Sequence, residues 1–370
     1  ELNARACKAI GLADWVIGSD RQLEVIAHLL NGASNTKTLP PLRDLATWLN
    51  EKNSTGETIV VLASGDPLFY GIGRWFSKHY ALDILHFYPA VSSIQAACHE
   101  LGLSLQDVDV LSLHGRPLAH IRKTLKPAQT LLVLSDKKSS PQALAEECLK
   151  AGFKQATITV CETLGYPEQK VSHFEVQALS QSDQVFDPLH LSVISSHMAT
   201  QADTVQLPSF PGIPDENFIT QIGSEQQVSQ TAKTMITKRE VRLAILSLMQ
   251  ANNADIIWDI GAGCGSVAVE LAYWNKQLQV YAIEHHVDRL DCLKANQDRF
   301  GVVSQLHIIA GSAPESLVDL PLPSKVFIGG SDGRLPELLA SVWQTLPVQG
   351  VLVASAVTES SKQHLINFMN

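Results

Sequence analysis

Apolar residues along the chain follow two alternating patterns, short continuous runs and longer runs at helical spacing. Short runs that are rich in β-branched residues, such as 58–63, 130–134 and 157–161, predict buried strands. Between such runs, apolar positions recur every three or four residues, as over 42–50, and predict amphipathic helices. Strand and helix patterns alternate along most of the chain, which predicts an α/β fold.

The same patterns give the expected order of the elements. In the first part of the chain we expect strands at 14–18, 58–63, 82–88, 108–113, 130–134, 157–161 and 189–194, and helices at 21–30, 42–50, 72–79, 94–101 and 140–151. In the second part we expect strands at 256–258, 279–283, 305–309, 325–328 and 351–354, and helices at 235–249, 266–272, 286–300, 335–346 and from 360 onward.

The chain is longer than one hydrophobic core usually supports. With 370 residues, it is expected to form two domains. Residues 195–233 are rich in Gln, Ser, Pro and Thr and poor in apolar residues, which is typical of a linker. We therefore expect one domain over 1–200, a linker over 201–233 and a second domain over 234–370.

Composition narrows the class of protein. Apolar residues make up 45% of the chain and charged residues 18%, and the net charge of −9 disfavours nucleic acid as a partner. No apolar run reaches membrane-spanning length and no signal peptide is recognisable, so we expect a cytoplasmic protein without a membrane partner. The six cysteines form no C-x-x-C pair and the histidines lack metal-ligand spacing, so no metal site is expected.

The clearest chemical motif follows the strand at 256–258. That strand ends in Asp259, and a glycine turn comes next: Gly261, Ala262, Gly263, Cys264 and Gly265. Glycine lets the backbone approach a ligand closely, so one interpretation is a ligand-binding loop. The alternative interpretation is a strand-to-helix turn with a structural role only. The third glycine comes one residue earlier than in the dinucleotide pattern G-x-G-x-x-G. We interpret Cys264 as a small turn residue, not a reactive thiol.

The glycine turn resembles the S-adenosylmethionine (SAM) loop of Rossmann-like methyltransferases. About 20 residues further on, the next strand ends in Glu284, where a carboxylate can accept hydrogen bonds from both ribose hydroxyls. For Glu284 alone, a surface acid at a strand end is the other interpretation.

Three segments of the first half resemble the tetrapyrrole methylase family: VLASGDPLFYG (61–71), YPAVSSIQAA (88–97) and LLVLSD (131–136). ETLGYPEQKV (162–171) matches the cobalamin-pathway branch of that family. The resemblance implies two α/β lobes that hold SAM between their strand-end loops. Ala90 stands where the family usually has Gly, and the first strand and glycine-proline loop of the family are expected to precede residue 1. The implied SAM contacts are Ser64, Gly65, Asp66, Phe69, Ser92 and Ser93, with Ser135 as a further candidate.

The second half resembles the decarboxylating methyltransferases of the cobalamin pathway. The resemblance rests on FPGIPDENF (210–218), MITKREVR (235–242), WDIGAGCGS (258–266) and FIGGSDG (327–333). It implies a Rossmann-like SAM methyltransferase domain. In the family this domain continues into further strands, which are expected to follow residue 370. In addition to the glycine turn and Glu284, the implied SAM contacts are Thr237 and Ala313.

Two of these positions have a second interpretation as helix caps. Ser92 with Gln95, and Thr237 with Glu240, each have the spacing of a capping box. A cap explains the hydroxyl residue without any ligand, so both roles stay open for Ser92 and Thr237.

The order of both halves resembles the fused methyltransferases of cobalamin biosynthesis. The resemblance implies methylation of precorrin-6Y at C5 and C15, with decarboxylation of the C12 acetate, to give precorrin-8x. SAM carries its own leaving group, so the protein has to align the reacting atoms, and we assign no catalytic residue. The alternatives are a methyltransferase with one activity on another tetrapyrrole, RNA or protein, and an inactive truncated chain.

A precorrin carries many carboxylates, so basic residues near the two sites are candidates for binding it. For each of them, a solvated surface charge is the alternative. We also expect a homo-oligomer, although no pattern fixes the number of subunits. The basic candidates are Arg116 with His114 in the first domain, and Lys238, Arg239, Arg242 and Arg334 in the second.

Overall fold

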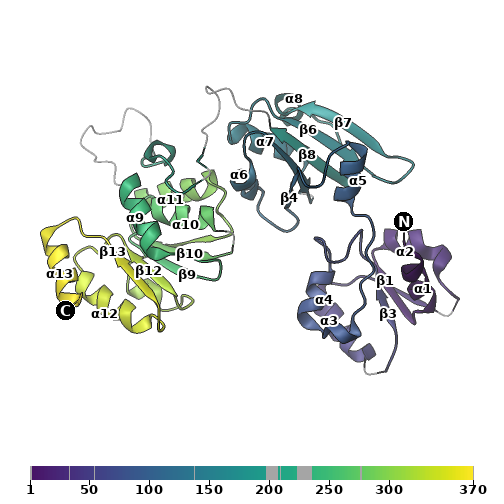
Figure 1. Ribbon diagram of the computed structural model, residues 1–370, viewed down its shortest axis with the longest axis horizontal. Helices are drawn as coiled ribbons and strands as arrows, with labels where there is room; N and C mark the ends of the chain where they lie inside the picture. Colours follow the sequence, from purple (N-terminus) through teal and green to yellow (C-terminus); the bar gives the residue numbers. More distant parts are fainter. Residues whose placement is uncertain are drawn as a thin grey trace. The chain divides into compact units, whose positions relative to one another are not determined.

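The computed structural model describes residues 2–32, 34–53, 55–136, 138–196, 207–208, 210–222, 236–275 and 277–369. Three sheets organise these residues, and helices alternate with strands along most of the chain (Figure 1), which confirms the predicted α/β class. Contacts divide the chain into two compact units. The first comprises Glu1–Val108, Cys161–Val171 and Phe186–Leu191, and the second comprises Asp109–Val160, Ser172–Val185 and Ser192–Asn370.

The first unit is built on a three-stranded parallel sheet with β1 (Trp15–Gly18) at its centre, between β2 (Asn35–Thr38) and β3 (Ile59–Val61). Neighbouring residues of β1 point to opposite faces. Val16 packs with α1 and α2, whereas Ile17 packs with α3 and the residues around α4. Figure 1 shows the two helix pairs on opposite sides of the sheet. The helices of this unit are α1 (Ala4–Leu12), α2 (Asp20–Ile26), α3 (Leu42–Asn53), α4 (Gly73–His79) and α5 (Ser93–Glu100).

A five-stranded sheet follows, in the order β4-β5-β8-β6-β7. β4 is parallel to β5, and β8 is antiparallel to β5. Most of this sheet belongs to the second unit, but the ends of β6, β7 and β8 fall within the ranges of the first. Its elements are β4 (Asp109–Ser112), α6 (Ile121–Thr124), β5 (Gln129–Leu134), α7 (Pro141–Lys150), β6 (Thr157–Glu162), β7 (Lys170–Glu175), α8 (Val176–Ser180) and β8 (His190–Ser196).

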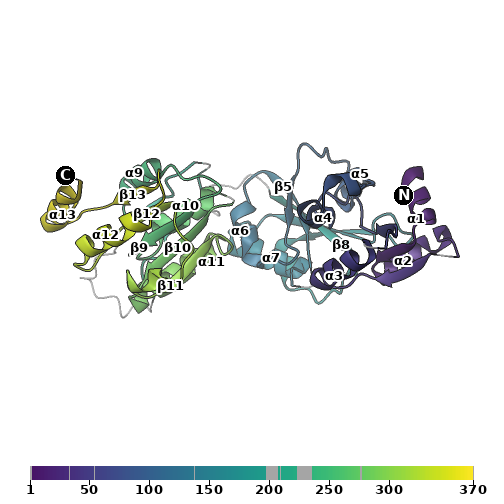
Figure 2. The ribbon, with the colours of Figure 1, turned by 90° about the horizontal axis from the view of Figure 1, so that it is seen from below.

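The third sheet has five parallel strands in the order β11-β10-β9-β12-β13 (Figure 1 and Figure 2). One core joins α9, α10 and α11 to one face, and a second core joins α12 and α13 to the other, so the sheet is wound on both sides. Its elements are α9 (Arg239–Met249), β9 (Ile256–Ile260), α10 (Ser266–Trp274), β10 (Gln279–Glu284), α11 (Val287–Arg299), β11 (Leu306–Ala310), β12 (Lys325–Ile328), α12 (Leu335–Thr345), β13 (Val351–Ala354) and α13 (Glu359–Met369).

The register of this sheet brings the carboxyl ends of its strands to one edge. Ile260 at the end of β9 pairs with Ile283 of β10 and with Ile328 of β12. Glu284 pairs with Ala310 at the end of β11. The strand order changes direction between β9 and β12, and the crevice beside such a switch point is where ligands bind in open α/β sheets.

Two predicted details are wrong, and two strands were missed. The strand expected over 82–88 is a short 3₁₀ turn, Leu82–Ile84, followed by irregular backbone, and the apolar side chains of Leu82 and Ile84 are exposed. Strands β2 and β7 were missed because neither contains an apolar run: β2 is entirely polar, and β7 has four polar residues among its six. Helix α9 begins at Arg239 with Lys238 at its N-cap and no side-chain cap bond, so the capping box expected at Thr237 is absent.

Among the helices of the described residues, none combines the length and the apolar character that a membrane crossing requires.

Candidate functional site

Two of the three glycines in the turn after β9 pack against neighbouring residues, and the third faces open space. Gly261, Gly263 and Gly265 all have positive φ, at 71°, 60° and 82°. A Cβ at Gly261 would lie 2.6 Å from the backbone of Gly330, and a Cβ at Gly265 would overlap Leu293 of α11. A Cβ at Gly263 would meet no atom within 4 Å. The turn therefore packs tightly against its neighbours and presents Gly263 to open space, as a ligand-cradling loop requires.

Glu284, at the end of β10, holds the glycine turn from the neighbouring strand. Its Oε2 accepts a hydrogen bond from Gly263 N at 2.9 Å, and its Oε1 accepts from the backbone N–H groups of His285 and His286, both at 2.9 Å. Glu284 is only 2% exposed. An ionised carboxylate only accepts hydrogen bonds, and this one lies beside the open face of Gly263, where it can receive the hydroxyls of a sugar.

Asp259 is a buried carboxyl group directly before the turn. It is 1% exposed, and neither oxygen makes a hydrogen bond of ordinary geometry within the described residues. Burial raises the pKa of Asp259 to about 7, against a smaller opposing effect of the Ala268 N–H, and the charge of Glu284 acts in the same direction as burial. The site thus contains an acid that carries its proton up to neutral pH.

Two further loops meet the turn at this edge of the sheet. Gly311 N donates to Glu284 O at 2.9 Å, which places the loop containing Ala313 beside Glu284. Gly329 N donates to Ile260 O, also at 2.9 Å, which ties the loop after β12 to the end of β9. The structure therefore brings the glycine turn, Glu284 and the Ala313 loop together, as the sequence motifs predict.

In the first unit, two of the predicted contact segments touch each other. Gly65 has a φ of 70°, and a Cβ there would lie 2.7 Å from Ser92 Cα, so the loop after β3 packs directly on the start of α5. Ser64 Oγ accepts a hydrogen bond from Gln22 Nε2 at 3.1 Å. Asp66 Oδ1 accepts from Leu68 N at 2.8 Å and closes its own turn.

The remaining predicted positions of this half differ in exposure. Ser92 forms the predicted capping box with Gln95, which is confirmed, and Ser93 is the exposed first residue of α5. Phe69 is partly exposed, with its ring 5.0 Å from that of Tyr70. Ser135 directly follows β5, in the part of the sheet assigned to the second unit. The structure thus brings Gly65 and Ser92 into contact and places Ser135 in the other unit.

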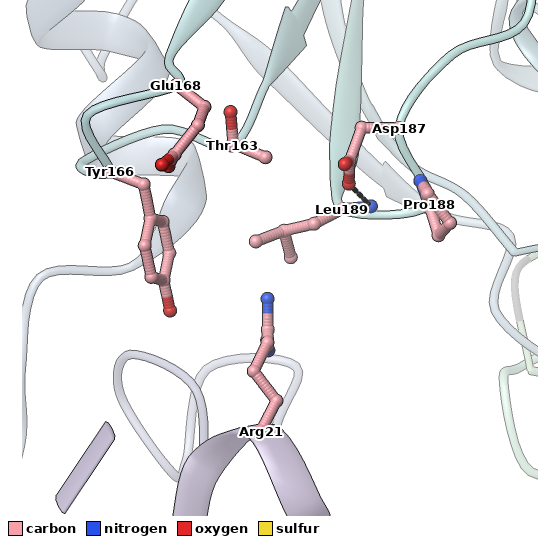
Figure 3. Close-up of a pocket in the computed structure, with 7 residues that line it drawn as sticks. All are labelled: Arg21, Thr163, Tyr166, Glu168, Asp187, Pro188 and Leu189. Atoms are coloured by element: carbon pink, nitrogen blue, oxygen red, sulfur yellow. Dashed lines mark hydrogen bonds between the residues drawn. The ribbon is translucent and has the colours of Figure 1, made fainter. Parts of the chain in front are cut away.

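A pocket of about 420 Å³ opens in the first unit (Figure 3). Arg21 rises into it from α2 toward Leu189, and the ring of Tyr166 stands to one side with its centroid 6.0 Å from the guanidinium carbon. Thr163 has a φ of 48°, which is rare for a β-branched residue, and its hydroxyl is buried without a partner within the described residues. Glu168, Asp187 and Pro188 complete the lining.

Two family sequence models match the chain. One, described as Tetrapyrrole (Corrin/Porphyrin) Methylases, matches residues 1–180, and the other, described as Precorrin methyltransferase domain, matches residues 230–370. A Sinorhizobium sp protein named precorrin-6Y C(5,15)-methyltransferase (decarboxylating) is 32% identical over 366 residues, which cover 99% of this chain and 84% of that protein. The chain belongs to the precorrin-6Y C5,15-methyltransferase (decarboxylating) family.

Two shorter relatives of this family member act, by name, at one carbon each. A Pyrobaculum calidifontis protein named probable cobalt-precorrin-6B C(15)-methyltransferase (decarboxylating) is 34% identical over 152 residues, 41% of this chain and 72% of that protein. A Salmonella typhimurium protein named cobalt-precorrin-7 C(5)-methyltransferase is 27% identical over 175 residues, 47% of this chain and 84% of that protein.

Within this precorrin-6Y methyltransferase family member, Arg242 has a structural position. It is 0% exposed, and each of its three guanidinium nitrogens donates a hydrogen bond, to Glu270, to Asp215 and Thr237 O, and to Ile213 O. A buried guanidinium with these partners has no surface to offer a substrate carboxylate. We therefore leave Arg242 out of the substrate site proposed below. The sequence could not show this, because an arginine at this helical position also fits an exposed face.

The other basic candidates lie at the surface. Lys238 pairs with Asp215 at 3.5 Å, and Arg334 pairs with Glu315 at 2.7 Å and with Glu337 at 2.9 Å. Arg239 is exposed at the start of α9. In the loop after β4, His114 and Arg116 are exposed, and Arg116 donates to Ser112 O at 3.2 Å. Of these, Arg334 lies between two carboxylates, which raise its pKa.

One group in the described residues has the spacing of metal ligands: Glu284, His285 and His286, whose ligand atoms lie within 4.8 Å of one another. Both histidines are exposed, and the group offers only one ligand atom from each of three residues, so we assign it no metal role.

Sequence reasoning missed three buried polar residues of the second unit. Glu270 and Asn296 are 0% exposed and bond the backbone of residues 212–219, and Asp259 was noted only as the end of a strand. The sequence does not show what Asn296 bonds, because its partners lie up to 77 positions away. A polar residue on the otherwise apolar stripe of α11 is the one signal that could have pointed to it.

Proposed function

We propose that the chain methylates precorrin-6Y at C5 and C15 with SAM as the methyl donor, and removes the carboxyl group of the C12 acetate as carbon dioxide to give precorrin-8x. The observation that carries the proposal is the 32% identity over 99% of the chain to a protein of that name. The separate C(5)- and C(15)-methyltransferases that match shorter parts of the chain support a division into two activities.

We assign the C5 activity to a tetrapyrrole methylase domain over 1–200 and the C15 and decarboxylating activity to a domain over 234–370, joined by residues 201–233. The family models that match 1–180 and 230–370 support these limits. The part of 201–233 that the structure describes includes Ile213 and Phe218, which pack into the core of α9, α10 and α11. This packing supports grouping the end of the joining segment with the second domain.

In the second domain, the glycine turn and Glu284 fit a nucleoside-bearing methyl donor. Gly263 offers backbone next to open space, and the Glu284 carboxylate beside it offers acceptors for the ribose hydroxyls. Ala313 lies in the loop that the Gly311 N–H joins to the Glu284 carbonyl, and this loop fits the neighbourhood of the adenine. When bound, SAM supplies an electrophilic methyl group and its own leaving group. The chain then has to orient the tetrapyrrole carbon toward that methyl and exclude water.

In the first domain, the touching loops at Gly65 and Ser92 are the proposed donor contacts, together with Ser64, Asp66, Phe69 and Ser93. Gly65 brings the two loops within van der Waals distance, which supports a single site made by both. The nearby pocket with Arg21 adds a cation for a substrate carboxylate, although Glu168 and Asp187 line it as well. Arg116, Lys238 and Arg334 stay in the proposal as substrate-binding candidates.

The test uses the purified full chain. Calorimetric titration with S-adenosylhomocysteine, the demethylated product of SAM, is expected to give two sites per chain, and incubation with precorrin-6Y and SAM is expected to give a product with two added methyl groups and one lost carboxyl group by mass spectrometry. Absence of any binding would contradict the whole proposal. One site with one methylation would restrict the activity to a single domain.

A further inference from the structure

A segment before α9 is bound across the helices of the second domain by buried polar side chains. We call this segment, residues 212–219, the strap. Glu270 of α10 accepts hydrogen bonds from Gly212 N at 2.7 Å and Ile213 N at 3.2 Å. Arg242 of α9 donates to Ile213 O and pairs with Glu270 at 2.9 Å. Both side chains are 0% exposed, so the first end of the strap is fixed inside the domain.

Asn296 of α11 fixes the other end of the strap and also reaches the glycine turn. Its Oδ1 accepts from Ile219 N at 2.8 Å, and its Nδ2 donates to Ile219 O at 2.8 Å. The same Nδ2 donates a second hydrogen bond to Cys264 O at 2.9 Å. Asn296 is 0% exposed, so one buried amide joins the strap, α11 and the turn.

The strap determines which way the Asn296 amide faces. Toward the turn, the amide meets only an acceptor, the Cys264 carbonyl, so the NH₂ group has to point there. Ile219 offers one donor and one acceptor, and the two bonds form together only in that same orientation. If the amide were turned over, Oδ1 would face the Cys264 carbonyl and Nδ2 would face the Ile219 N–H, which leaves buried groups unsatisfied.

We propose that Asn296 is a positioning residue for the glycine turn, and that the strap sets its orientation. This inference rests on the proposed function of the turn as a methyl-donor site. The turn is held at two points, by Glu284 at Gly263 N and by Asn296 at Cys264 O. Glu284 has to share its carboxylate with the ribose when the donor binds. Asn296 stays bonded to the turn in both states and keeps the backbone in place.

The first test measures the turn without any ligand, by hydrogen exchange of the peptides that cover 259–267 in the full chain. Asn296→Asp keeps the acceptor for Ile219 N–H but sets an oxygen against two carbonyls. Loss of the bond to Cys264 is expected to speed exchange of the turn amides about tenfold. Ile219→Pro leaves Asn296 intact and removes the N–H that orients it, so a smaller change in the same direction is expected. If N296D folds poorly, hydrogen exchange of the Ile219→Pro variant still tests the inference.

Asn275→Asp is the matched control, since Asn275 lies in the same domain and, among the residues that the structure describes, its Nδ2 bonds Leu271 O at 3.0 Å and neither strap nor turn. Unchanged exchange of the turn in N296D and I219P, or an equal change in N275D, would overturn the inference.

The second test separates positioning from general damage by kinetics. In N296D, the KM for SAM in the C15 step is expected to rise about tenfold, while kcat at saturating SAM stays within about threefold of wild type. The C5 step, measured in the same chain, is expected to be unchanged. An unchanged KM in an active N296D chain contradicts the inference. If the wild type shows no C15 methylation, the proposed function fails, and the exchange measurement still decides the role of Asn296.

Discussion

At the scale of single residues, two aspartates of the β9 region have opposite surroundings. Burial raises the pKa of Asp259 to about 7, because loss of water disfavours the charged carboxylate more than the Ala268 N–H favours it. Burial also acts to raise the pKa of Asp255, but hydrogen bonds from Asn252, Ser324 and Lys325 outweigh it, and the pKa is lowered. Sequence alone shows two acids four positions apart, and only the packed structure distinguishes them.

This difference predicts opposite pH profiles for two matched substitutions. The unfolded chain releases the Asp259 proton near 3.8, whereas the folded chain keeps it to about 7, so rising pH destabilises the wild type through this window by up to about 1.4 kcal/mol per pH unit. Asp259→Asn is therefore expected to be more stable than wild type at neutral pH, with the advantage fading toward about pH 4. The measurement is the free energy of unfolding by urea across this range.

Asp255→Asn is the control with the opposite sign. A lowered pKa stabilises the fold above the unfolded pKa and loses this effect as pH falls through the folded pKa. D255N is therefore expected to be less stable than wild type at neutral pH and to approach it in acid. Parallel profiles for D259N and D255N would contradict both assignments.

A second residue-scale prediction concerns two glycines of the same turn. Gly261→Ala places a methyl group 2.6 Å from the Gly330 backbone and is expected to destabilise the domain strongly. Gly263→Ala meets no atom within 4 Å, so we expect it to fold at the cost of a left-handed alanine, about 1–2 kcal/mol, and to block the donor because its methyl points into the open face. Thermal denaturation and calorimetry with S-adenosylhomocysteine test the pair. Normal donor binding by a folded G263A chain would contradict the location of the site.

At the scale of elements, strands and caps could be predicted where local chemistry decides them. The sequences of β5, β6, β9 and β10 are apolar runs and predict strands. A strand whose two faces are both buried carries such a continuous run. The Ser92 capping box forms as predicted, whereas Thr237 does not cap α9, and its carbonyl instead accepts a hydrogen bond from Arg242. The same capping-box spacing, with Gln95 in one case and Glu240 in the other, thus gives different outcomes, because the buried guanidinium of Arg242 bonds the Thr237 carbonyl.

The cap of α5 gives a prediction about stability. Ser92→Ala removes the bond to Gln95 N and is expected to cost about 1 kcal/mol of unfolding free energy, whereas Ser92→Thr keeps an acceptor and is expected to cost less. Ser93→Ala is the neighbouring control, since Ser93 is exposed within the helix, and is expected to change stability by less than about 0.5 kcal/mol. Equal effects of S92A and S93A would show that the cap contributes nothing.

At the scale of the whole molecule, the sequence predicts the ligand-binding motifs of the site better than the buried polar network that holds them. The glycine turn and Glu284 are local motifs, and both occupy the predicted edge of the sheet. Arg242, Glu270 and Asn296 could not be assigned, because their partners are distant in sequence and a buried polar network has no local pattern. From the sequence, Arg242 in particular is expected to be an exposed cation, whereas in the structure it is buried.

The two proposed sites predict a divided product pattern for the full chain. Gly263→Ala alters only the turn of the second domain, so it is expected to lose the C15 methyl group, to retain the C12 acetate and to keep one of the two S-adenosylhomocysteine sites. Mass spectrometry and nuclear magnetic resonance of the product, with calorimetry, identify which methyl group and which site are lost. Loss of both binding sites in a chain that still folds would mean that the two activities depend on one site.

The thiol inside the glycine turn has a consequence for the lifetime of the enzyme. Cys264 is 4% exposed, and burial raises its pKa to about 11. Under the proposed function, the turn cradles a sulfonium compound, which alkylates soft nucleophiles, and the thiolate is the form that attacks. With that pKa, only about one thiol in ten thousand is ionised at pH 7. Burial of the Cys264 sulfur thus protects the protein from methylation by its own methyl donor.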